Sequence, residues 1–308
     1  MNNNTSEITI SVVIPTYFSE DFVEQSLVSV CEQTYPCCEI IVSDDGSTDQ
    51  TVQRVRAVLA RYPLIRHTVI ENTHQGPGAT RNSGAACATG DWIAFLDSDD
   101  TWQPDKLEQV ALAIERFDPT FVFHNEQIYD PASGQHRVLP FTSWHNPSVH
   151  PFLDLYRRNY LSPSSALVRR TLFEASGGFE PSLLSAQDYE LWLRMALLPE
   201  FRLCAVDRCL TTWLKRGGSI TTQVDRRLRA LLRIYEQYQP HVRALSPHPR
   251  RDLLRFKGKI YSGCGLMALR QGEYFSGAWN ILRGNLIWPR LDWFSKGWRC
   301  CRAEELKS

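Results

Sequence analysis

Two clusters of aspartate follow apolar, strand-like stretches of this sequence. The first, DDGSTD, occupies residues 44–49 after EIIVS, and the second, DSDD, occupies residues 97–100 after WIAFL. Ligands of an open α/β sheet bind in the crevice beyond the carboxyl ends of its strands. We therefore expect both clusters to face one site, where carboxylates can accept hydrogen bonds or bind divalent cations.

The second cluster has the composition of a metal site. Asp99 and Asp100 are the expected ligands of Mg²⁺ or Mn²⁺, which favour carboxylate, water and phosphate oxygens over a closed protein cage. Such an ion would bridge the phosphates of a nucleotide diphosphate. The alternative is that the cluster only caps a helix beginning near Pro104, but it holds more capping residues than one helix needs.

The first cluster fits the base and ribose of a nucleotide. Gly46 permits a tight turn, and Asp44 and Asp45 can accept hydrogen bonds from a base N–H or from ribose hydroxyls. An Asp-Gly turn followed by a Ser/Thr helix cap explains the same residues equally well. The nucleotide interpretation gains weight because a second acidic cluster ends another strand.

Arg81 is the candidate for a phosphate contact. It lies in GPGATRNSGA, residues 76–85, and its planar guanidinium can pair bidentately with phosphate oxygens. A solvated position on a helix is an equally good interpretation. The segment is not a P-loop, because it lacks the G-K-[ST] ending.

Asp188 stands at the start of an amphipathic stretch, SAQDYELWLRMALL, behind a Gly-Gly turn. A carboxylate there can act as a general base if it reaches the hydroxyl that is to be deprotonated. An aspartate in the first turn of a helix is, however, more often a surface residue that complements the helix dipole. The neighbouring residues do not decide between the two.

The elements that would position these residues alternate between strand and helix from residue 8 to about 125. This alternation predicts βαβ units and a mostly parallel sheet. A Pro-, Ser- and His-rich stretch predicts a loop or short-strand connection, and the C-terminal region predicts helices. The expected strands are 8–16, 39–45, 66–72, 92–100, 121–129 and 200–214, the expected helices are 21–33, 47–62, 79–90, 104–117 and 185–198, and the connection is 130–165.

Charge is unevenly distributed along the 308 residues. Lys plus Arg (34) balances Asp plus Glu (34), so the total gives no support to nucleic-acid binding. Residues 225–308 contain 17 Lys/Arg and 7 Asp/Glu, a difference of +10, which leaves −10 for residues 1–224. The acidic part of the chain is therefore the part with the strand-end clusters.

The sequence indicates a cytoplasmic protein. Its nine cysteines, without metal-ligand spacing, are typical of free thiols in a reducing compartment. No signal peptide and no apolar run long enough to span a membrane is apparent. The Trp-rich basic stretch 279–302 can lie on an anionic membrane surface, at the inner face of the membrane, although a helix with Trp as core is favoured.

Six motifs occur in an order and spacing that closely resemble the family 2 glycosyltransferases with the GT-A fold: PTY at 15–17, DDGSTD, GPGATRNSG, FLDSDD, GGF and QDYELWLR. The resemblance covers residues 8 to about 222, and it is specific for the family but not for the sugar. It implies an α/β fold with a mostly parallel, Rossmann-like nucleotide-binding sheet. The expected organisation is a catalytic domain over 1–224, with a nucleotide half at about 8–125 and an acceptor half at about 126–224, and a basic helical extension over 225–308.

The resemblance also implies an activity and a set of site residues. The activity is inverting transfer of a sugar from a nucleotide-diphosphate donor, usually UDP-linked, to an acceptor hydroxyl, with Mg²⁺ or Mn²⁺ on the diphosphate. Asp188 matches the family's catalytic base. The implied donor-binding residues are Pro15, Thr16, Tyr17, Asp44, Asp45, Arg81, Asp97 and Ser98, with Asp97 and Asp99 serving ribose and metal and Asp100 as a further ligand.

Two positions depart from the family's pattern. Gln187 replaces a glutamate that often precedes the base, which removes a carboxylate that would raise the pKa of its neighbour. Arg216 stands where many relatives carry a histidine, so a cationic contact to the diphosphate is expected there.

The predicted function is synthesis of a surface polysaccharide, lipopolysaccharide or other glycan on a glycan or lipid-linked acceptor. A nucleotidyltransferase is the main alternative, but the Gly-rich, Arg/Lys-containing loop near its start is absent. A non-catalytic nucleotide-sugar-binding scaffold is a third, against which the intact Asp99, Asp100 and Asp188 argue. The acceptor pocket is expected within about 130–185.

Overall fold

The computed structural model describes residues 8–215 and 223–289, and the chain divides into two compact units. The first unit consists of Met1–Leu155, Asn159–Ser182 and Gln187–Arg216. The second consists of Tyr156–Arg158, Leu183–Ala186 and Gly217–Ser308. The domain boundary predicted after residue 224 stays a prediction beside this division, which falls after residue 216.

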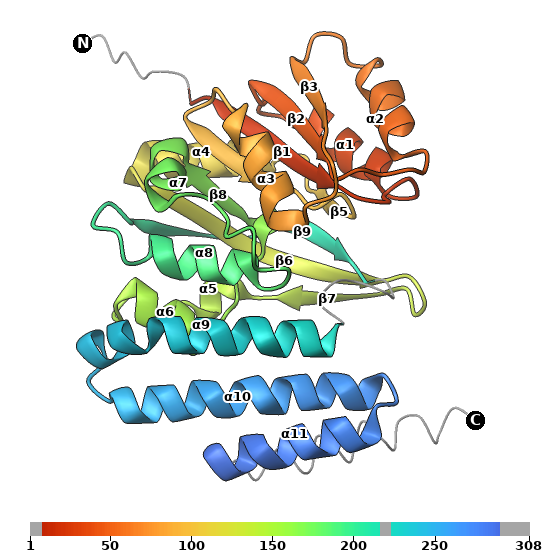
Figure 1. Cartoon of the computed structure of the whole chain (residues 1–308). Coiled ribbons are helices and arrows are strands. Elements are labelled where there is room, and N and C mark those ends of the chain that lie inside the picture. Colours follow the sequence, from red (N-terminus) through yellow and green to blue (C-terminus); the bar gives the residue numbers. More distant parts are fainter. Residues whose placement is uncertain (1–7, 216–222, 290–308) are drawn as a thin grey trace, which may run out of the picture. The chain divides into compact units, whose positions relative to one another are not determined.

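The first unit is built on one mixed sheet (Figure 1). Within the described residues it has nine strands in the order β3-β2-β1-β4-β8-β6-β9-β5, and β7 pairs with β6. The strands are β1 (Ile10–Thr16), β2 (Glu39–Asp44), β3 (His67–Glu71), β4 (Trp92–Phe95), β5 (Asp100–Trp102), β6 (Phe121–Asp130), β7 (Gln135–Leu139), β8 (Ala166–Arg169) and β9 (Leu203–Leu214).

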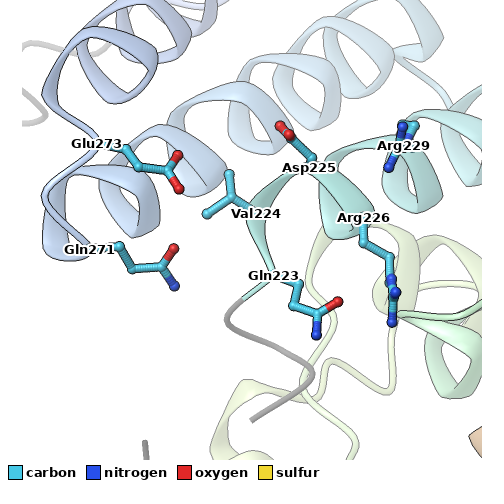
Figure 2. A pocket seen from close by; sticks show the side chains of 7 residues that line it. All are labelled: Gln223, Val224, Asp225, Arg226, Arg229, Gln271 and Glu273. Carbon is cyan, nitrogen blue, oxygen red and sulfur yellow. The ribbon is translucent and has the colours of Figure 1, made fainter. Parts of the chain in front are cut away.

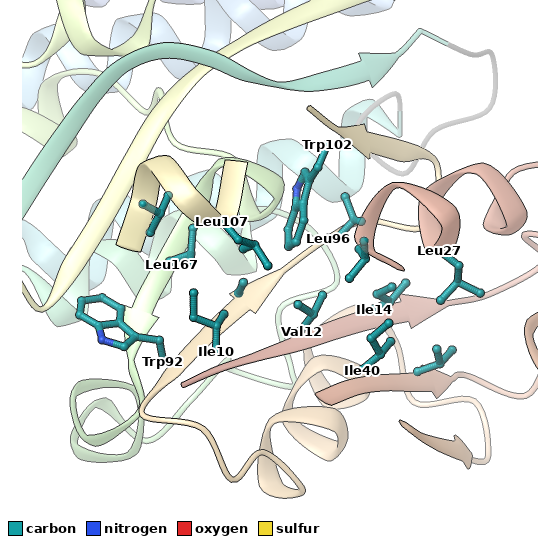
Figure 3. Packing of buried hydrophobic residues seen from close by; sticks show 14 of the residues in the cluster. Ile10, Val12, Ile14, Leu27, Ile40, Trp92, Leu96, Trp102, Leu107 and Leu167 are labelled. Atoms are coloured by element: carbon teal, nitrogen blue, oxygen red, sulfur yellow. The ribbon is translucent and has the colours of Figure 1, made fainter. Parts of the chain in front are cut away.

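The predicted parallel sheet forms one part of it. β1 pairs in parallel with β2 and with β4, and β2 pairs in parallel with β3. Every residue of β2 and β4 is buried, as expected for strands that are covered on both faces. Trp92, Trp102 and Leu107 pack with the aliphatic side chains of β1 and β2 in one core cluster (Figure 3). This burial fixes the register, because a slip of one residue would turn each side chain to the opposite face.

Beyond β4 the strand directions alternate. β8 runs antiparallel to β4 and β6, whereas β9 runs parallel to β6 and antiparallel to β5. The expected single strand over 92–100 is interrupted, since β4 ends at Phe95 and the short strand β5 begins at Asp100. The second acidic cluster therefore lies in the turn between these two strands, and its last residue, Asp100, begins β5.

Helices cover the sheet and complete the first unit. They are α1 (Val23–Cys31), α2 (Thr51–Leu59), α3 (Pro77–Ala86), α4 (Lys106–Phe117), α5 (Phe141–Trp144), α6 (Pro151–Arg157, whose last two residues fall in the second unit), the 3-10 helix η1 (Pro163–Ser165), α7 (Arg170–Ser176) and α8 (Gln187–Met195). α3 packs against β1 and β2. It lies very close to β1, because a Cβ on Gly84 would be only 2.6 Å from Val13 Cγ1.

Within its described residues the second unit contains three long helices, which confirms the expectation of a helical C-terminal region. They are α9 (Val224–Leu245), α10 (Pro249–Arg270) and α11 (Tyr274–Ile287). α10 packs against both of the others (Figure 1). None of the helices in the described ranges is both long and apolar enough to cross a membrane.

Glycines bring α10 and α11 into close contact. A Cβ on Gly265 of α10 would lie 2.7 Å from the carbonyl oxygen of Gly277 and 2.9 Å from the backbone nitrogen of Ile281. Contacts that short to backbone atoms cannot be relieved by a rotamer change. Glycine at this position therefore sets the separation of the two helices.

Replacing Gly265 with alanine should destabilise the second unit, because the two helix backbones must move apart. We expect a loss of about 1–3 kcal/mol of unfolding free energy, the usual cost of overpacking. Gly263→Ala on the same helix is the matched control, since a Cβ there meets nothing within 4 Å and alanine is the better helix former. Urea unfolding of both variants checks the prediction, which equal stabilities would contradict.

Candidate functional site

The strand-end residues predicted to form the site meet at one edge of the sheet. Thr16 ends β1 and pairs in register with Asp44, which ends β2. Their side chains are bonded directly, since Thr16 Oγ1 donates to Asp44 Oδ1 at 2.8 Å. β4 lies on the other side of β1 and leads through Leu96 into Asp97. The two acidic clusters therefore flank the carboxyl end of β1.

Asp44 and Asp45 are buried, and each holds a loop in place. Asp44 accepts hydrogen bonds from the backbone N–H and the hydroxyl of Ser47, at 2.7 and 2.6 Å. Asp45 accepts the backbone N–H groups of Gln75 and Gly76, at 2.8 and 3.0 Å. The second of these loops leads directly into α3. Both carboxylates thus organise the site, and their direct contact with a nucleotide stays a prediction.

Tyr17 and His74 form an aromatic stack beside these loops. Their ring centroids are 4.5 Å apart with the planes inclined by 24°, and Tyr17 is 43% exposed. His74 Nδ1 lies 2.9 Å from Asp45 Oδ2, which orients the imidazole. Partly exposed aromatic rings are surfaces on which nucleobases stack. The sequence indicated Tyr17 through the PTY motif, whereas nothing in the sequence singled out His74.

The second acidic cluster is a turn whose side chains alternate in exposure. The Asp100 N–H donates to the Asp97 carbonyl at 2.9 Å. Asp97 and Asp99 are half-buried, whereas Ser98 and Asp100 are buried. Ser98 Oγ lies 2.7 Å from the hydroxyl of Ser19, in the loop after β1. Two carboxylates are therefore partly open at the strand end, and the third points into the protein.

Arg81 is buried against this acidic turn. Its Nη2 donates to Asp97 Oδ1 at 2.5 Å, and its guanidinium lies over the Phe179 ring, 5.5 Å from the ring centroid. Its Nε is buried and has no hydrogen-bond partner among the described residues. The interpretation of Arg81 as a solvated helix residue is therefore wrong, and the structure places a cation at the second acidic cluster.

The GGF motif joins α3 to α8. Asn82 of α3 accepts the Phe179 N–H and donates to the Phe179 carbonyl, both at 2.8 Å. Gly178 has φ of +72°, and a Cβ there would lie 2.7 Å from Asn82 Oδ1, so glycine is needed for both reasons. Arg194 of α8 donates to the Gly178 carbonyl at 2.8 Å.

Asp188 lies in the first turn of α8 and is half-buried. The preceding residue, Gln187, faces α3, because a Cβ on Gly78 would be 3.8 Å from Gln187 Cγ. Gly78 and Arg81 share one face of α3, being three residues apart. The start of α8 therefore packs against the helix whose arginine bonds Asp97. The role of Asp188 as a base stays a prediction.

Ser164 connects the acidic turn to the rest of the first unit, a role that no sequence motif indicates. Its hydroxyl donates to Asp100 Oδ2 at 2.5 Å and accepts the Asp97 N–H at 3.1 Å. It is fully buried. Its carbonyl oxygen accepts three further hydrogen bonds, from Trp102 Nε1 at 3.1 Å, Lys106 Nζ at 2.8 Å and Thr211 Oγ1 at 3.0 Å.

Lys106 and Glu126 add two buried ionisable groups beside Asp100. Burial lowers the pKa of Lys106, against the opposing effect of the Glu126 and Asp100 carboxylates. Burial likewise raises the pKa of Glu126 to about 7, although the Ser162 hydroxyl and Lys106 favour its charged form. The pKa of Asp100 lies well above its usual range because of burial first and then the nearby carboxylates. Raised carboxyl pKa values reduce the repulsion within this acidic group.

The open carboxylates of the turn fit a divalent cation. Asp97 has a side chain 31% exposed and Asp99 is half-buried, whereas Asp100 is only 4% exposed and bonded to Ser164. In the part of the chain that the structure describes, no three His, Cys, Asp or Glu side chains gather as a complete metal site. Asp97 and Asp99 therefore suit an ion that takes its other ligands from phosphate and water. The ligand role of Asp100 stays a prediction that its burial does not favour.

Two further features belong to the second unit or fall outside the described residues. Arg216 falls outside the described residues, so its predicted contact with a diphosphate stays a prediction. A surface pocket of about 470 Å³ lies in the second unit, between the start of α9 and the turn from α10 to α11 (Figure 2). Its lining combines Arg226 and Arg229 with Asp225 and Glu273, and this balance of charges favours no particular ligand.

Replacing Ser164 with alanine should loosen the acidic turn, because both hydrogen bonds of its hydroxyl to the turn are lost. We expect a cost of about 1–3 kcal/mol, as for a buried acceptor left without its donor. Ser165→Ala is the matched control, since Ser165 is equally buried but its hydroxyl donates to the Ser162 carbonyl at 3.0 Å. Amide hydrogen exchange should be faster at Asp97 in the Ser164 variant only; unchanged exchange there would contradict the role of this hydroxyl.

The raised pKa of Glu126 predicts a pH-dependent stability. The carboxyl titrates at 4.5 when unperturbed and at about 7 in the folded protein, so between these values the folded state keeps a proton that the unfolded state loses. The stability that this residue contributes is complete below 4.5 and lost above about 7, a change of about 3 kcal/mol. Glu126→Gln should remove it. Urea unfolding on both sides of this range checks the prediction, and an equal pH dependence in wild type and variant would refute it.

Comparisons with known proteins agree with this geometry. The model of the family described as Glycosyl transferase family 2 matches residues 11–177, more than half of the chain. The putative teichuronic acid biosynthesis glycosyltransferase TuaG of Bacillus subtilis is 30% identical over 218 residues, covering 69% of this chain and 81% of its own. WfgD of Escherichia coli, a UDP-Glc:alpha-D-GlcNAc-diphosphoundecaprenol beta-1,3-glucosyltransferase, is 28% identical, covering 64% and 73%.

Solved structures share the fold. TarS 1-349 of S. aureus in complex with UDP-GlcNAc has a TM-score of 0.65 at 21% identity, covering 90% of this chain and 79% of its own. The mannosyltransferase PcManGT from Pyrobaculum calidifontis, in complex with GDP-Man and Mn²⁺, has a TM-score of 0.62 at 20% identity, covering 94% and 79%. The chain belongs to glycosyltransferase family 2 and has the GT-A fold.

Proposed function

We propose that this glycosyltransferase moves a sugar from a UDP-linked donor to an acceptor hydroxyl, with inversion at the anomeric carbon. The observation that carries the proposal is the pair of Arg81 and Asp97, bonded at 2.5 Å where β1, β2 and β4 end. A cation beside open carboxylates suits a diphosphate that is bound together with a divalent ion. UDP is chosen because WfgD is named for a UDP-glucose donor and the TarS structure holds UDP-GlcNAc.

The donor base would stack at Tyr17 and His74, with Pro15 and Thr16 beside it. Asp45 supports this part of the site, because its carboxylate fixes His74 and the two backbone N–H groups that follow. The ribose would then lie toward Asp97 and Ser98. A nucleotide in this position has its diphosphate near Arg81, which is the group able to stabilise charge on the departing diphosphate.

Asp97 and Asp99 are the residues that would hold Mg²⁺ or Mn²⁺. When bound, the ion neutralises charge on the diphosphate. The protein's own contribution is to keep both carboxylates at the strand end. Ser164 holds the turn from inside the protein through Asp97 and Asp100, and Arg81 holds the Asp97 carboxylate from α3.

Asp188 would take the proton from the acceptor hydroxyl. The acceptor oxygen forms its bond to the anomeric carbon while the bond from that carbon to the diphosphate oxygen breaks on the opposite face. The stereochemistry therefore inverts, and the nucleotide diphosphate leaves. The packing of α8 on α3, through Gln187 and Gly78, supports this assignment because it brings the start of α8 toward the donor side.

The acceptor is proposed to be a lipid-linked intermediate in the synthesis of a polysaccharide or lipopolysaccharide. TuaG and AmsB are named for teichuronic acid and amylovoran biosynthesis, and WfgD for an acceptor on diphosphoundecaprenol. Such an acceptor would place the reaction at the cytoplasmic face of a membrane. The C-terminal region is the part of the chain proposed to contact that membrane.

Nucleotide binding should stabilise the purified protein, and this is the test of the donor assignment. A ligand of the folded state present at a hundredfold excess over its Kd adds about 2.7 kcal/mol. We expect a rise in melting temperature with UDP and Mn²⁺ that EDTA abolishes, and smaller rises with GDP, dTDP and CDP. Asp99→Asn should lose the Mn²⁺-dependent part. Absence of any shift with all four nucleotides would overturn the proposed function.

Asp188→Asn should abolish transfer without abolishing donor binding. Loss of a general base usually lowers the rate by about a hundredfold or more, whereas the UDP-induced stabilisation should persist. Asp91→Asn is the matched control, because Asp91 precedes β4 at the opposite end of the strand from Asp97, where it bonds Thr9. Turnover measured with a UDP-sugar decides the point; an active Asp188 variant would remove this residue as the base.

A further inference from the structure

One face of α11 exposes four large apolar side chains. Phe275 is 88% exposed, Trp279 54%, Leu282 45% and Leu286 76%. Their spacing of four, three and four residues places them within an arc of about 60° on a helix of 3.6 residues per turn. They form one continuous stripe along the helix, here called the α11 stripe.

The opposite face of α11 is already used. Gly277, Ile281 and Gly284 are buried, and a Cβ on Gly277 would lie 2.9 Å from the Gly265 carbonyl of α10. α11 is therefore apolar on two sides, and among the described residues only one of them serves the packing of the second unit. Apolar stripes of this kind on soluble proteins mark interaction sites.

The charge of this region fits an anionic partner. α11 contains Arg283 and no acidic residue. Arg283 is exposed and flanks the stripe, about 80° around the helix from Phe275. Its guanidinium lies over the Tyr261 ring of α10, 4.5 Å from the ring centroid, and Nη2 donates to the Tyr261 hydroxyl at 3.3 Å. Residues 225–308 carry 17 Lys/Arg against 7 Asp/Glu, a difference of +10. Basic residues beside Trp, Phe and Leu are typical of helices that lie in the interface of an anionic bilayer.

The size of the α11 stripe argues against a second copy of the chain as its partner. An aromatic side chain offers roughly 150–250 Å², so these four partly exposed side chains expose roughly 500 Å². A stable interface needs about 800 Å² from each partner. The helix, at 14 residues, is also only about 21 Å long, too short to cross a hydrocarbon core of about 30 Å.

We infer that α11 docks on an anionic lipid surface, lying in its plane with Phe275, Trp279, Leu282 and Leu286 inserted among the acyl chains. Arg283 at the edge of the stripe contacts lipid phosphate. The inference rests on the proposed function in one respect: a lipid-linked acceptor gives the enzyme a reason to be at a membrane. The docking itself requires neither donor nor catalytic residues.

Flotation with lipid vesicles tests the inference on the full chain. The vesicles contain either equal parts of phosphatidylglycerol and phosphatidylcholine or phosphatidylcholine alone. Phe275→Gln/Leu286→Gln changes the two most exposed positions of the stripe, and Leu64→Gln, at a residue of the first unit that is 98% exposed, is the matched control. The double substitution removes apolar surface equal to several CH₂ groups, so binding of the protein to the vesicles should weaken at least about tenfold.

We expect wild type and the Leu64 variant to float with the anionic vesicles only. The double variant should remain in the bottom fraction with both kinds of vesicle. UDP with Mn²⁺ should shift the melting temperature of all three proteins equally, which separates this test from that of the proposed function. Flotation of the double variant at the wild-type level would overturn the inference. The inference would also be overturned if wild type did not float with anionic vesicles. The same holds if wild type sedimented as a dimer and the double variant as a monomer.

Discussion

Three aspartates within four residues repel one another, and the first unit depends on the groups that hold them together at one strand end. Arg81 bonds Asp97 from α3, and Ser164 bonds both Asp97 and Asp100 from inside the protein. The same Ser164 carbonyl accepts a hydrogen bond from the buried Lys106 Nζ. Removing one partner from such a buried charged group costs several kcal/mol, because the other charge is left uncompensated. Folding of this unit and assembly of its acidic site are therefore coupled.

The parallel part of the sheet and its acidic strand ends could be predicted from the sequence because their signals are local. Apolar runs ending in Asp44 and Asp97 identify two strands, and the intervening helices make those strands parallel. Parallel strands present their carboxyl ends at one edge, so acids that follow them must be neighbours. The register of Thr16 with Asp44 confirms this reasoning. Arg81 was indicated by its motif, although its burial was not.

The rest of the fold and of the site could not be predicted, because it depends on contacts between segments that are distant in the sequence. Ser164 lies in a Pro- and Ser-rich stretch that reads as a turn, and only its pairing with residues some sixty positions earlier reveals its function. Lys106 begins an amphipathic helix, where a lysine is ordinarily solvated, yet it is fully buried. The antiparallel strand β5 is short, and helix α6 has only seven residues. Elements of that length carry too few residues for a period to be recognised.

Most of the hydrogen bonds described above that tie the segments after residue 160 into the first unit are made to main-chain atoms. Asn82 hydrogen-bonds both the N–H and the carbonyl of Phe179. Arg194 bonds the Gly178 carbonyl, and three side chains donate to the carbonyl of Ser164. A hydrogen bond to a backbone carbonyl does not depend on the side chain of the residue that supplies the carbonyl. Positions that contribute only main-chain atoms are thus free to diverge, provided that the glycine turn, the Ser164 hydroxyl and Asp188 are kept. If the acceptor binds here, as the sequence predicts, new acceptor specificities can arise by substitution or segment exchange without disturbing the acidic strand ends.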